Sequence, residues 1–123
     1  MPVSVLLVDD DAGFRRALRR LSESENDCQL VGEAENGEEA VRLEQELRPE
    51  IIFMDISMPK LNGLEATRRI KARRPEVKII ILTIHEEEAY RKAATECGAD
   101  GFVLKKNILT NLHSIMRKTH ASS

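Results

Sequence analysis

Residues 3–11 read Val-Ser-Val-Leu-Leu-Val-Asp-Asp-Asp, a short apolar run that ends in three carboxylates. The run is too short to span a bilayer, but it suits a strand that other elements cover on both faces. Four further apolar runs follow, at residues 28–33, 51–54, 77–82 and 102–104. Because continuous apolar runs are typical of parallel sheets, these segments are predicted to form one sheet.

The segments between the apolar runs have helical periodicity. Apolar side chains recur three or four residues apart in each of them, which predicts helices with one face toward the core. Asn36 is expected to cap a helix that runs to Leu47, and Gly98 is expected to end the fourth helix. The expected core-facing positions are Phe14, Ala17, Leu18 and Leu21; Ala40, Leu43 and Leu47; Leu64, Thr67 and Ile70; Ala89, Ala93 and Cys97; and Ile108, Leu112, Ile115 and Met116.

Basic residues gather on the first and third of these helices. Lysine and arginine number 19 and aspartate and glutamate 21, so the net charge is −2. A dedicated nucleic-acid binder usually has a basic excess, so this balance argues against one. We therefore expect the basic faces to be solvated surfaces. Their residues are Arg15, Arg16, Arg19 and Arg20, then Arg68, Arg69, Lys71, Arg73 and Arg74.

The length of 123 residues gives room for one domain, expected over residues 1–118, with a frayed tail at 119–123. Apolar residues make up 41% and charged residues 33%, which excludes a disordered chain. Cys28 and Cys97 lack the spacing of a metal knuckle and are expected to be buried free thiols. With no basic leader visible, the sequence predicts a cytoplasmic protein with no membrane partner.

Strands and helices are thus predicted to alternate five times along the chain. Such alternation, with right-handed crossovers, favours a three-layer αβα sandwich around a parallel sheet. For five strands we predict the flavodoxin-like order 2-1-3-4-5.

Polar side chains stand at four of the predicted strand ends. Asp9 and Asp10 follow the first strand, Asp55 the third, Thr83 the fourth and Lys105 the fifth. The first and third strands are neighbours in the predicted order, so the three carboxylates are expected to converge on one pocket. Two like charges about 4 Å apart repel by ~4 kcal/mol at an effective dielectric constant of about 20. One lysine cannot balance three acids, so the pocket is expected to take a hard dication such as Mg²⁺; helix capping is the alternative role for a single aspartate.

The same residues carry a resemblance to a known family. The chain resembles the receiver domain of two-component response regulators over essentially its whole length. The residues after Thr83 and the absence of proline after Lys105 are similar to the NarL/LuxR-type branch, many members of which carry a C-terminal helix-turn-helix. The matching segments are residues 5–11, Asp55-Ile56-Ser57-Met58-Pro59, Asn62-Gly63, Thr83, and residues 98–105.

The resemblance implies a phosphoacceptor signalling domain that catalyses only its own phosphorylation and dephosphorylation. Asp55 would accept a phosphoryl group from a phosphohistidine on a sensor histidine kinase. The metal, Mg²⁺ or Mn²⁺, would be held by Asp10, Asp55 and the backbone carbonyl of Ser57, with Asp9 in contact directly or through water. Charge neutralisation and positioning are the main requirements of phosphoryl transfer, so these residue types suit the role.

Further positions take roles from the same resemblance. Lys105 would pair with the phosphate, Thr83 would donate its hydroxyl to a phosphate oxygen, and Phe102 would change rotamer. Ser57 and His85 would tune the lifetime of the phosphate. The implied output is a phosphorylation-dependent homodimer or a docked partner, with no direct DNA binding by this chain, because regulation of transcription would pass through an effector domain outside it.

One position departs from the pattern. Many receivers have proline after the lysine, in a cis peptide, and here that residue is Lys106. A cis bond before a residue other than proline costs ~2.5–4 kcal/mol, so the Lys105–Lys106 bond is expected to be trans.

Three other functions are weighed against the receiver. A flavin protein needs a phosphate loop after the first strand, where the residues 9–11 would repel phosphate. A phosphatase-type hydrolase needs a second acid two residues after its nucleophile, and that position is Ser57. A pseudo-receiver, which binds proteins without being phosphorylated, is the serious alternative, although the acidic pocket argues against it.

Overall fold

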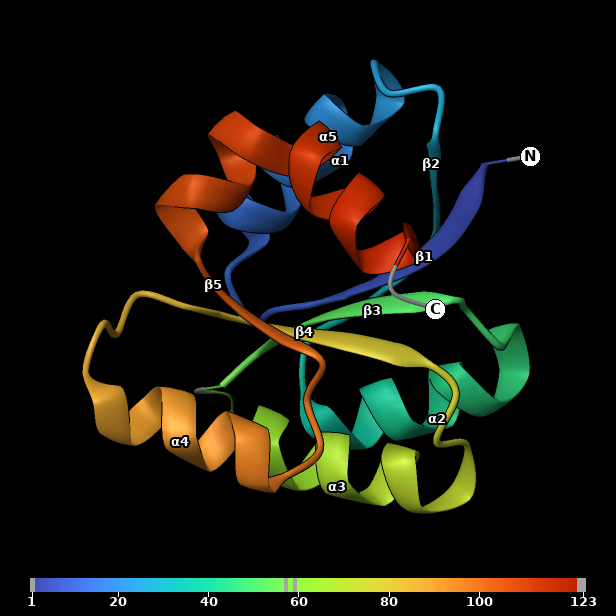
Figure 1. Ribbon diagram of the computed structural model, residues 1–123. Coiled ribbons are helices and arrows are strands. Elements are labelled where there is room, and N and C mark those ends of the chain that lie inside the picture. The colour runs from blue at the N-terminus through green and yellow to red at the C-terminus, as the bar shows by residue number, and fades with distance from the viewer. Residues whose placement is uncertain (1, 57, 59, 122–123) are drawn as a thin grey trace.

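The computed structural model describes residues 2–56, 58 and 60–121, and over these residues it confirms the predicted alternation of strands and helices (Figure 1). The roles predicted for Ser57 concern a residue outside the described ones. The strands are β1 (Val3–Val8), β2 (Cys28–Ala34), β3 (Ile51–Asp55), β4 (Lys78–Thr83) and β5 (Gly101–Leu104). The helices are α1 (Ala12–Glu23), α2 (Gly37–Leu47), α3 (Gly63–Arg73), α4 (Glu88–Glu96) and α5 (Lys105–Ala121).

The sheet is parallel and has the strand order β2-β1-β3-β4-β5, as predicted. Helices α1 and α5 cover one face, and α2, α3 and α4 cover the other (Figure 1). Each face has its own apolar core. Phe53 and Leu112 belong to the core under α1 and α5, and Met54 and Ile70 belong to the core under α2, α3 and α4. The predicted three-layer αβα sandwich is therefore confirmed.

Local sequence explains where the helices begin and end. The side chains of Asp11, Asn36 and Asn62 accept hydrogen bonds from the backbone N–H groups that open α1, α2 and α3, which confirms the predicted cap at Asn36. Gly98 lies just beyond α4 with a φ of 94°, a conformation that favours glycine, and it ends that helix as predicted. The caps fix the helix starts that face the carboxyl ends of the strands.

The two edges of the sheet differ from its centre. Val5 pairs with Leu30 and Leu6 pairs with Gly32, so Val31 of β2 is an extra residue that forms a bulge. The opposite edge strand, β5, has only 4 residues. Both edges are therefore irregular or short, whereas β1, β3 and β4 are almost completely buried.

The expected core positions are mostly confirmed, with three exceptions. Ala17 and Ala89 are exposed, and Leu47 is 39% exposed. Half-buried Tyr90 takes the place of Ala89 in the core under α4, because its larger apolar surface gains more from burial than the methyl group of an alanine. Cys28 and Cys97 are free and buried, as predicted.

The expectation that the basic helix faces are solvated is wrong at three residues. The side chains of Arg15, Lys71 and Arg74 are only 13%, 14% and 11% exposed. Arg74 pairs with Glu44, whose side chain is 2% exposed, and it also donates to the carbonyl of Pro49. Periodicity had assigned these residues to the outside, but long basic side chains bury their stems where a carboxylate or a free carbonyl lies within reach.

Helix α5 follows β5 without a loop and is kinked at Asn111, whose φ and ψ are −132° and 27°. The structure records no cis peptide bond among the residues it describes, so Lys105–Lys106 is trans as predicted. The helix enters the segment that was expected to fray, where the hydroxyl of Thr119 donates to the Ile115 carbonyl; fraying in solution stays a prediction. No helix in the described part of the chain is both long and apolar enough to cross a membrane.

Candidate functional site

Three carboxylates meet at the carboxyl ends of β1 and β3. Asp9 and Asp10 follow the last residue of β1, and Asp55 is the last residue of the neighbouring strand β3. One oxygen from each carboxylate can be chosen so that all three lie within 4.8 Å of one another. Asp9 is 0% and Asp55 6% exposed, whereas Asp10 is exposed. The predicted convergence of these residues is therefore present in the structure.

Lys105 is the cation at this site. It is the first residue of α5, and its Nζ lies 2.7 Å from Asp9 Oδ2 and 3.6 Å from Asp55 Oδ2. Its side chain is 16% exposed, and the Phe14 ring lies 4.9 Å from the ammonium group. The ammonium thus bridges the two buried carboxylates and touches an aromatic face on α1.

The electrostatics of the site reflect an excess of negative charge. Burial raises the pKa of Asp55 to about 7, with Asp9 and then Asp10 adding to the rise and Lys105 opposing it. Burial alone would lower the pKa of Lys105, but Asp9 and Asp55 outweigh it and hold that pKa above its usual value. Without a metal, the site therefore keeps its lysine charged and holds a proton on Asp55 only below about neutral pH.

The residues fit a divalent metal ion. Carboxylate oxygens are the hard ligands that Mg²⁺ and Mn²⁺ prefer. Asp9 Oδ2 is buried and, apart from the ion pair with Lys105, accepts no hydrogen bond from the described residues. Its other oxygen, Oδ1, accepts the N–H of Asp11 at 2.9 Å. A buried carboxylate oxygen that already faces a cation suits contact with a metal ion or with its bound water.

Close backbone packing fixes the position of Asp55. A Cβ placed on Gly63 would lie 1.8 Å from the Asp55 carbonyl oxygen, so only glycine fits there. The Gly63 N–H also donates to the Ile56 carbonyl at 3.0 Å. The φ of Gly63 is not among the positive values, so backbone conformation is not the reason for glycine at this position. Glycine is required by the close approach of α3 to the end of β3.

Three further predicted residues lie on or near β4 and β5. Thr83 is 1% exposed, and its Oγ1 accepts the His85 N–H at 3.0 Å. The His85 ring stacks on Tyr90 at a centroid distance of 4.3 Å. Phe102 is half-buried beneath the Arg91 guanidinium, 4.7 Å from its ring centre. Ile81 pairs with Phe102 and Thr83 with Leu104, so Thr83 and Phe102 lie on the same face of the sheet.

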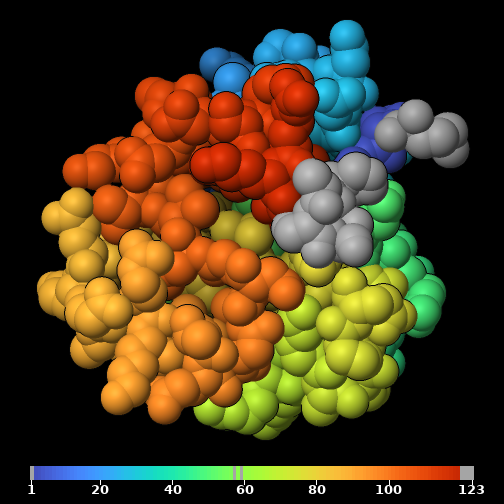
Figure 2. All heavy atoms as spheres, in the orientation of Figure 1, coloured from blue at the N-terminus to red at the C-terminus, as the bar shows by residue number. Residues whose placement is uncertain are grey.

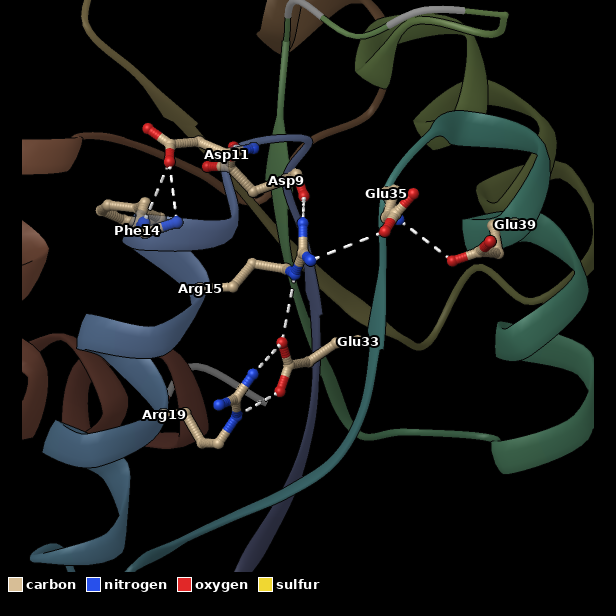
Figure 3. Close-up of polar contacts among 9 residues, drawn as sticks. Asp9, Asp11, Phe14, Arg15, Arg19, Glu33, Glu35 and Glu39 are labelled. Carbon is tan, nitrogen blue, oxygen red and sulfur yellow. Dashed lines mark hydrogen bonds and ion pairs between the residues drawn. The ribbon is translucent and has the colours of Figure 1, made fainter.

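The structure adds a residue that sequence reasoning missed. Arg15 reaches from α1 to the end of β1, where its Nη1 donates to the Asp9 carbonyl at 2.6 Å (Figure 3). It also donates through Nε to Glu33 of β2 at 3.1 Å. The available signal was its position one helical turn after the Asp11 cap, which points the side chain back toward the strand end.

Comparison with known proteins identifies the family. The sequence model described as the response regulator receiver domain matches residues 5–117. The transcriptional regulatory protein DegU of Brevibacillus brevis is 39% identical over 104 residues, which is 85% of this chain and 44% of that protein. The response regulator protein VraR of Staphylococcus saprophyticus is 34% identical over 122 residues, 98% of this chain and 57% of that protein. This chain spans about half the length of these curated relatives.

Solved structures agree with the sequence relatives. A LuxR-family two-component response regulator from Aurantimonas has a TM-score of 0.85 and 33% identity, covering 96% of this chain and 87% of that one. The response regulator domain of Thermotoga maritima CheB has a TM-score of 0.89 and 33% identity, covering 97% and 96%. The family transmits signals and is not a family of metabolic enzymes. This chain belongs to the response regulator receiver domains, in their NarL/LuxR-type branch.

Proposed function

We propose that Asp55 accepts a phosphoryl group from a phosphohistidine of a sensor histidine kinase, in a reaction that needs Mg²⁺ or Mn²⁺. The observation that carries the proposal is the unbalanced charge at the strand ends, where three carboxylates cluster and the half-buried Lys105 pairs with only two of them, Asp9 and Asp55. A purely structural site would pair these acids, because uncompensated buried charge destabilises the fold. An incomplete site is completed by a cation and by the phosphoryl group that the cation would bind.

The proposed reaction assigns a step to each side chain. An ionised Asp55 oxygen forms a bond to phosphorus while the bond from phosphorus to the donor nitrogen breaks, and that electron pair stays on the imidazole. A bound Mg²⁺ would lower the pKa of Asp55 and neutralise charge on the phosphoryl oxygens. Lys105 binds a second phosphoryl oxygen through its ammonium. The Thr83 hydroxyl can donate to a third oxygen while still accepting the His85 N–H, because a hydroxyl both donates and accepts.

The proposal includes hydrolysis of the aspartyl phosphate by the domain itself. Ser57 and His85 are the two residues proposed to tune the lifetime of the aspartyl phosphate. His85 is restrained next to Thr83 by its backbone hydrogen bond and by the stacked Tyr90 ring. We expect a change of the His85 side chain to alter the rate of water attack more than the rate of phosphorylation.

Intact-mass spectrometry after incubation with acetyl phosphate and Mg²⁺ tests the proposal. The wild type should gain one phosphoryl group, and a chelator should prevent the gain. Asp55→Asn should gain none, whereas Asp11→Asn should be phosphorylated, because Asp11 caps α1 and is not a member of the carboxylate cluster. Equal labelling of Asp55→Asn, or labelling that ignores the chelator, contradicts the proposal. A wild type that stays unlabelled would favour the pseudo-receiver alternative.

The proposed output runs from Thr83 to the surface of α4, β5 and α5, which are adjacent on one side of the molecule (Figure 2). Movement of Thr83 toward the phosphate would vacate space on the sheet face that it shares with Phe102. The same region exposes Ile84, which is 77% exposed, above a cavity of about 170 Å³ that Lys105 and Lys106 help to line. Repacking here would alter homodimerisation or the docking of a partner.

The wider role follows from the relatives as a proposal. DegU is named a transcriptional regulatory protein, and this chain matches 44% of it. We therefore infer that phosphorylation of this domain regulates transcription in the cytoplasm through an effector domain, and that this chain does not read DNA itself. A sequence-specific complex with DNA in a gel-shift titration at physiological salt would contradict the second statement.

A further inference from the structure

The metal site rests on a polar network that the reaction described above does not use. Arg15 lies between the end of β1 and the end of β2, with a side chain that is 13% exposed (Figure 3). Its Nη1 donates to the Asp9 carbonyl at 2.6 Å, its Nε donates to Glu33 at 3.1 Å, and its Nη2 lies 3.7 Å from a carboxylate oxygen of Glu35. A largely buried guanidinium with two hydrogen-bond partners and a third carboxylate nearby has little freedom to move.

Where the sheet ends, the Arg15 side chain supplies a hydrogen-bond donor that a neighbouring strand would otherwise provide. The Asp9 N–H donates to the Ala34 carbonyl at 3.0 Å, which continues the pairing of β1 with β2. Strand β2 ends at Ala34, so no further residue of that strand can donate to the Asp9 carbonyl. Since a buried carbonyl needs a donor, the Arg15 guanidinium supplies it. The end of β1 is therefore fixed by a side chain of α1.

The hydrogen bond from Arg15 to the Asp9 carbonyl also restrains the Asp10 carboxylate, which is proposed to bind the metal. The Asp9 carbonyl and the Asp10 N–H belong to one planar peptide group, so holding the carbonyl fixes the plane from which the Asp10 side chain leaves the backbone. The Asp9 carboxylate has its own restraints, namely the Asp11 N–H and Lys105. Asp10, in contrast, is exposed, so its direction depends mainly on the orientation of this peptide.

Glu33 holds the guanidinium in turn. Its Oε1 accepts from Arg15 Nε and from Arg19 Nη2, at 3.1 and 2.8 Å, and its Oε2 accepts from Arg19 Nε at 2.6 Å. Arg19 is 46% exposed, and among the described residues its side chain bonds to Glu33 and not to the Asp9 backbone. The two arginines thus share one carboxylate, but only Arg15 connects it to the metal site.

We propose that Arg15 is a positioning residue for the metal site: its guanidinium holds the Asp9–Asp10 peptide so that the Asp10 carboxylate faces Asp55, and Glu33 keeps the guanidinium in place. The inference rests on the metal requirement in the proposed function. Partners that orient a metal ligand typically change metal affinity by about 10–100-fold when they are removed. Arg19 provides a matched control, since it shares the helix and the carboxylate partner but lacks the contact with Asp9.

The test is a titration of the folded protein with Mn²⁺, without a phosphodonor, in which electron paramagnetic resonance measures free Mn²⁺. Arg15→Gln should raise the Mn²⁺ dissociation constant by about 10–100-fold, whereas Arg19→Gln should leave it unchanged. Arg15→Lys should recover part of the affinity, because an ammonium group can donate to the Asp9 carbonyl but cannot hold Glu33 in the same planar geometry. Glu33→Gln keeps Arg15 and should give a smaller loss of Mn²⁺ affinity. If Arg15→Gln does not fold, Glu33→Gln and Arg15→Lys test the inference in its place.

A second readout separates positioning from a general loss of structure. With acetyl phosphate, Arg15→Gln should need more Mg²⁺ to reach half of its maximal labelling rate, while the rate at saturating Mg²⁺ stays near that of the wild type. Wild-type affinity in Arg15→Gln, or an equal loss in Arg15→Gln and Arg19→Gln, overturns the inference. A wild type that binds Mn²⁺ but is not labelled at Asp55 contradicts the proposed function and leaves the role of Arg15 standing.

Discussion

The two ends of the sheet hold their buried charges in opposite ways. At the carboxyl ends, three carboxylates cluster, and the ammonium group of Lys105 pairs with the two buried ones, Asp9 and Asp55. At the amino ends, Glu44 is 2% exposed and lies 3.1 Å from the guanidinium of Arg74. One end therefore carries an excess of negative charge, whereas the other is balanced.

The difference separates charges that maintain the fold from charges that serve the site. Lys71 repeats the balanced arrangement, because its Nζ lies 2.6 Å from Asp100 and also donates to the carbonyl of Val77. The Lys71 contacts tie α3 to the starts of β4 and β5, whereas the Arg74 pair ties the end of α3 to α2. At the carboxyl ends, repulsion between carboxylates is retained and is relieved only when a cation binds. Neutralising one acid should thus have opposite effects on stability at the two ends.

The largest expected effect is at the amino end. Glu44→Gln should lower the free energy of unfolding by about 3 kcal/mol, because it leaves the Arg74 guanidinium buried without a counter-charge. Urea denaturation followed by circular dichroism measures this free energy of unfolding. The control is Glu46→Gln on the same helix, whose ion pair with Arg42 is exposed on both sides and should contribute about 0.3–0.5 kcal/mol. Equal losses in the two variants would remove the contrast between the two ends of the sheet.

A smaller effect is expected from the metal. Mg²⁺ at 100 times its dissociation constant should stabilise the wild type by about 2.7 kcal/mol, because the ion binds the folded state. Glu44→Gln should gain the same amount, since its site is intact, whereas Asp55→Asn should gain less. Thermal unfolding across a Mg²⁺ series gives the comparison. An equal gain in Asp55→Asn would exclude Asp55 as a metal ligand.

Neutralisation at the carboxyl end should stabilise the metal-free protein. The pKa of Asp55 is raised to about 7, and that of an unfolded aspartate is about 3.9. Between these values the folded protein keeps a proton that the unfolded chain has lost, so stability falls as the pH rises through this window. With a chelator at pH 8, Asp55→Asn should melt above the wild type, by about 4 °C for each kcal/mol gained in a domain of this size. The difference should vanish near pH 4; a constant difference would point to packing instead of charge.

The smallest effect should come from Phe14. Its ring lies 4.9 Å from the Lys105 ammonium, a contact that contributes about 0.5–1 kcal/mol at partly exposed sites. Phe14→Leu keeps most of the apolar volume and removes the ring face. A double-mutant cycle with Lys105→Met isolates the contact, and a coupling energy of zero would show that Lys105 is held by its carboxylates alone.

The sequence was sufficient to predict the sheet and the convergence of three carboxylates at its edge. Apolar runs identified the strands, and the strand order then brought Asp9, Asp10 and Asp55 together. These predictions depend on the chain direction and on which residue ends a strand, and both can be read locally. The roles of Thr83 and Phe102 remain predictions, although the structure puts them on one face of the sheet.

The contacts that hold the site could not be predicted in the same way. Helical periodicity assigned Arg15, Lys71 and Arg74 to solvated faces, because it reports the direction of a Cα–Cβ bond and not the reach of a long side chain. The carbonyl that Arg15 binds is free only because β2 ends where it does. The need for glycine at position 63 could not be predicted either, because the approach of α3 to the Asp55 carbonyl is a tertiary contact.

The bulge at Val31 has a consequence for the behaviour of whole molecules in concentrated solution. An open parallel sheet exposes unpaired amide groups along its outer strands, and these can recruit another copy of the chain. In β2 the extra residue breaks the regular spacing of those groups, and β5 offers a template of only 4 residues. Neither edge strand can pair with a long strand of another chain. Association of this domain is thereby directed toward its helical surfaces, where it can saturate at a defined number of copies instead of growing into a fibre.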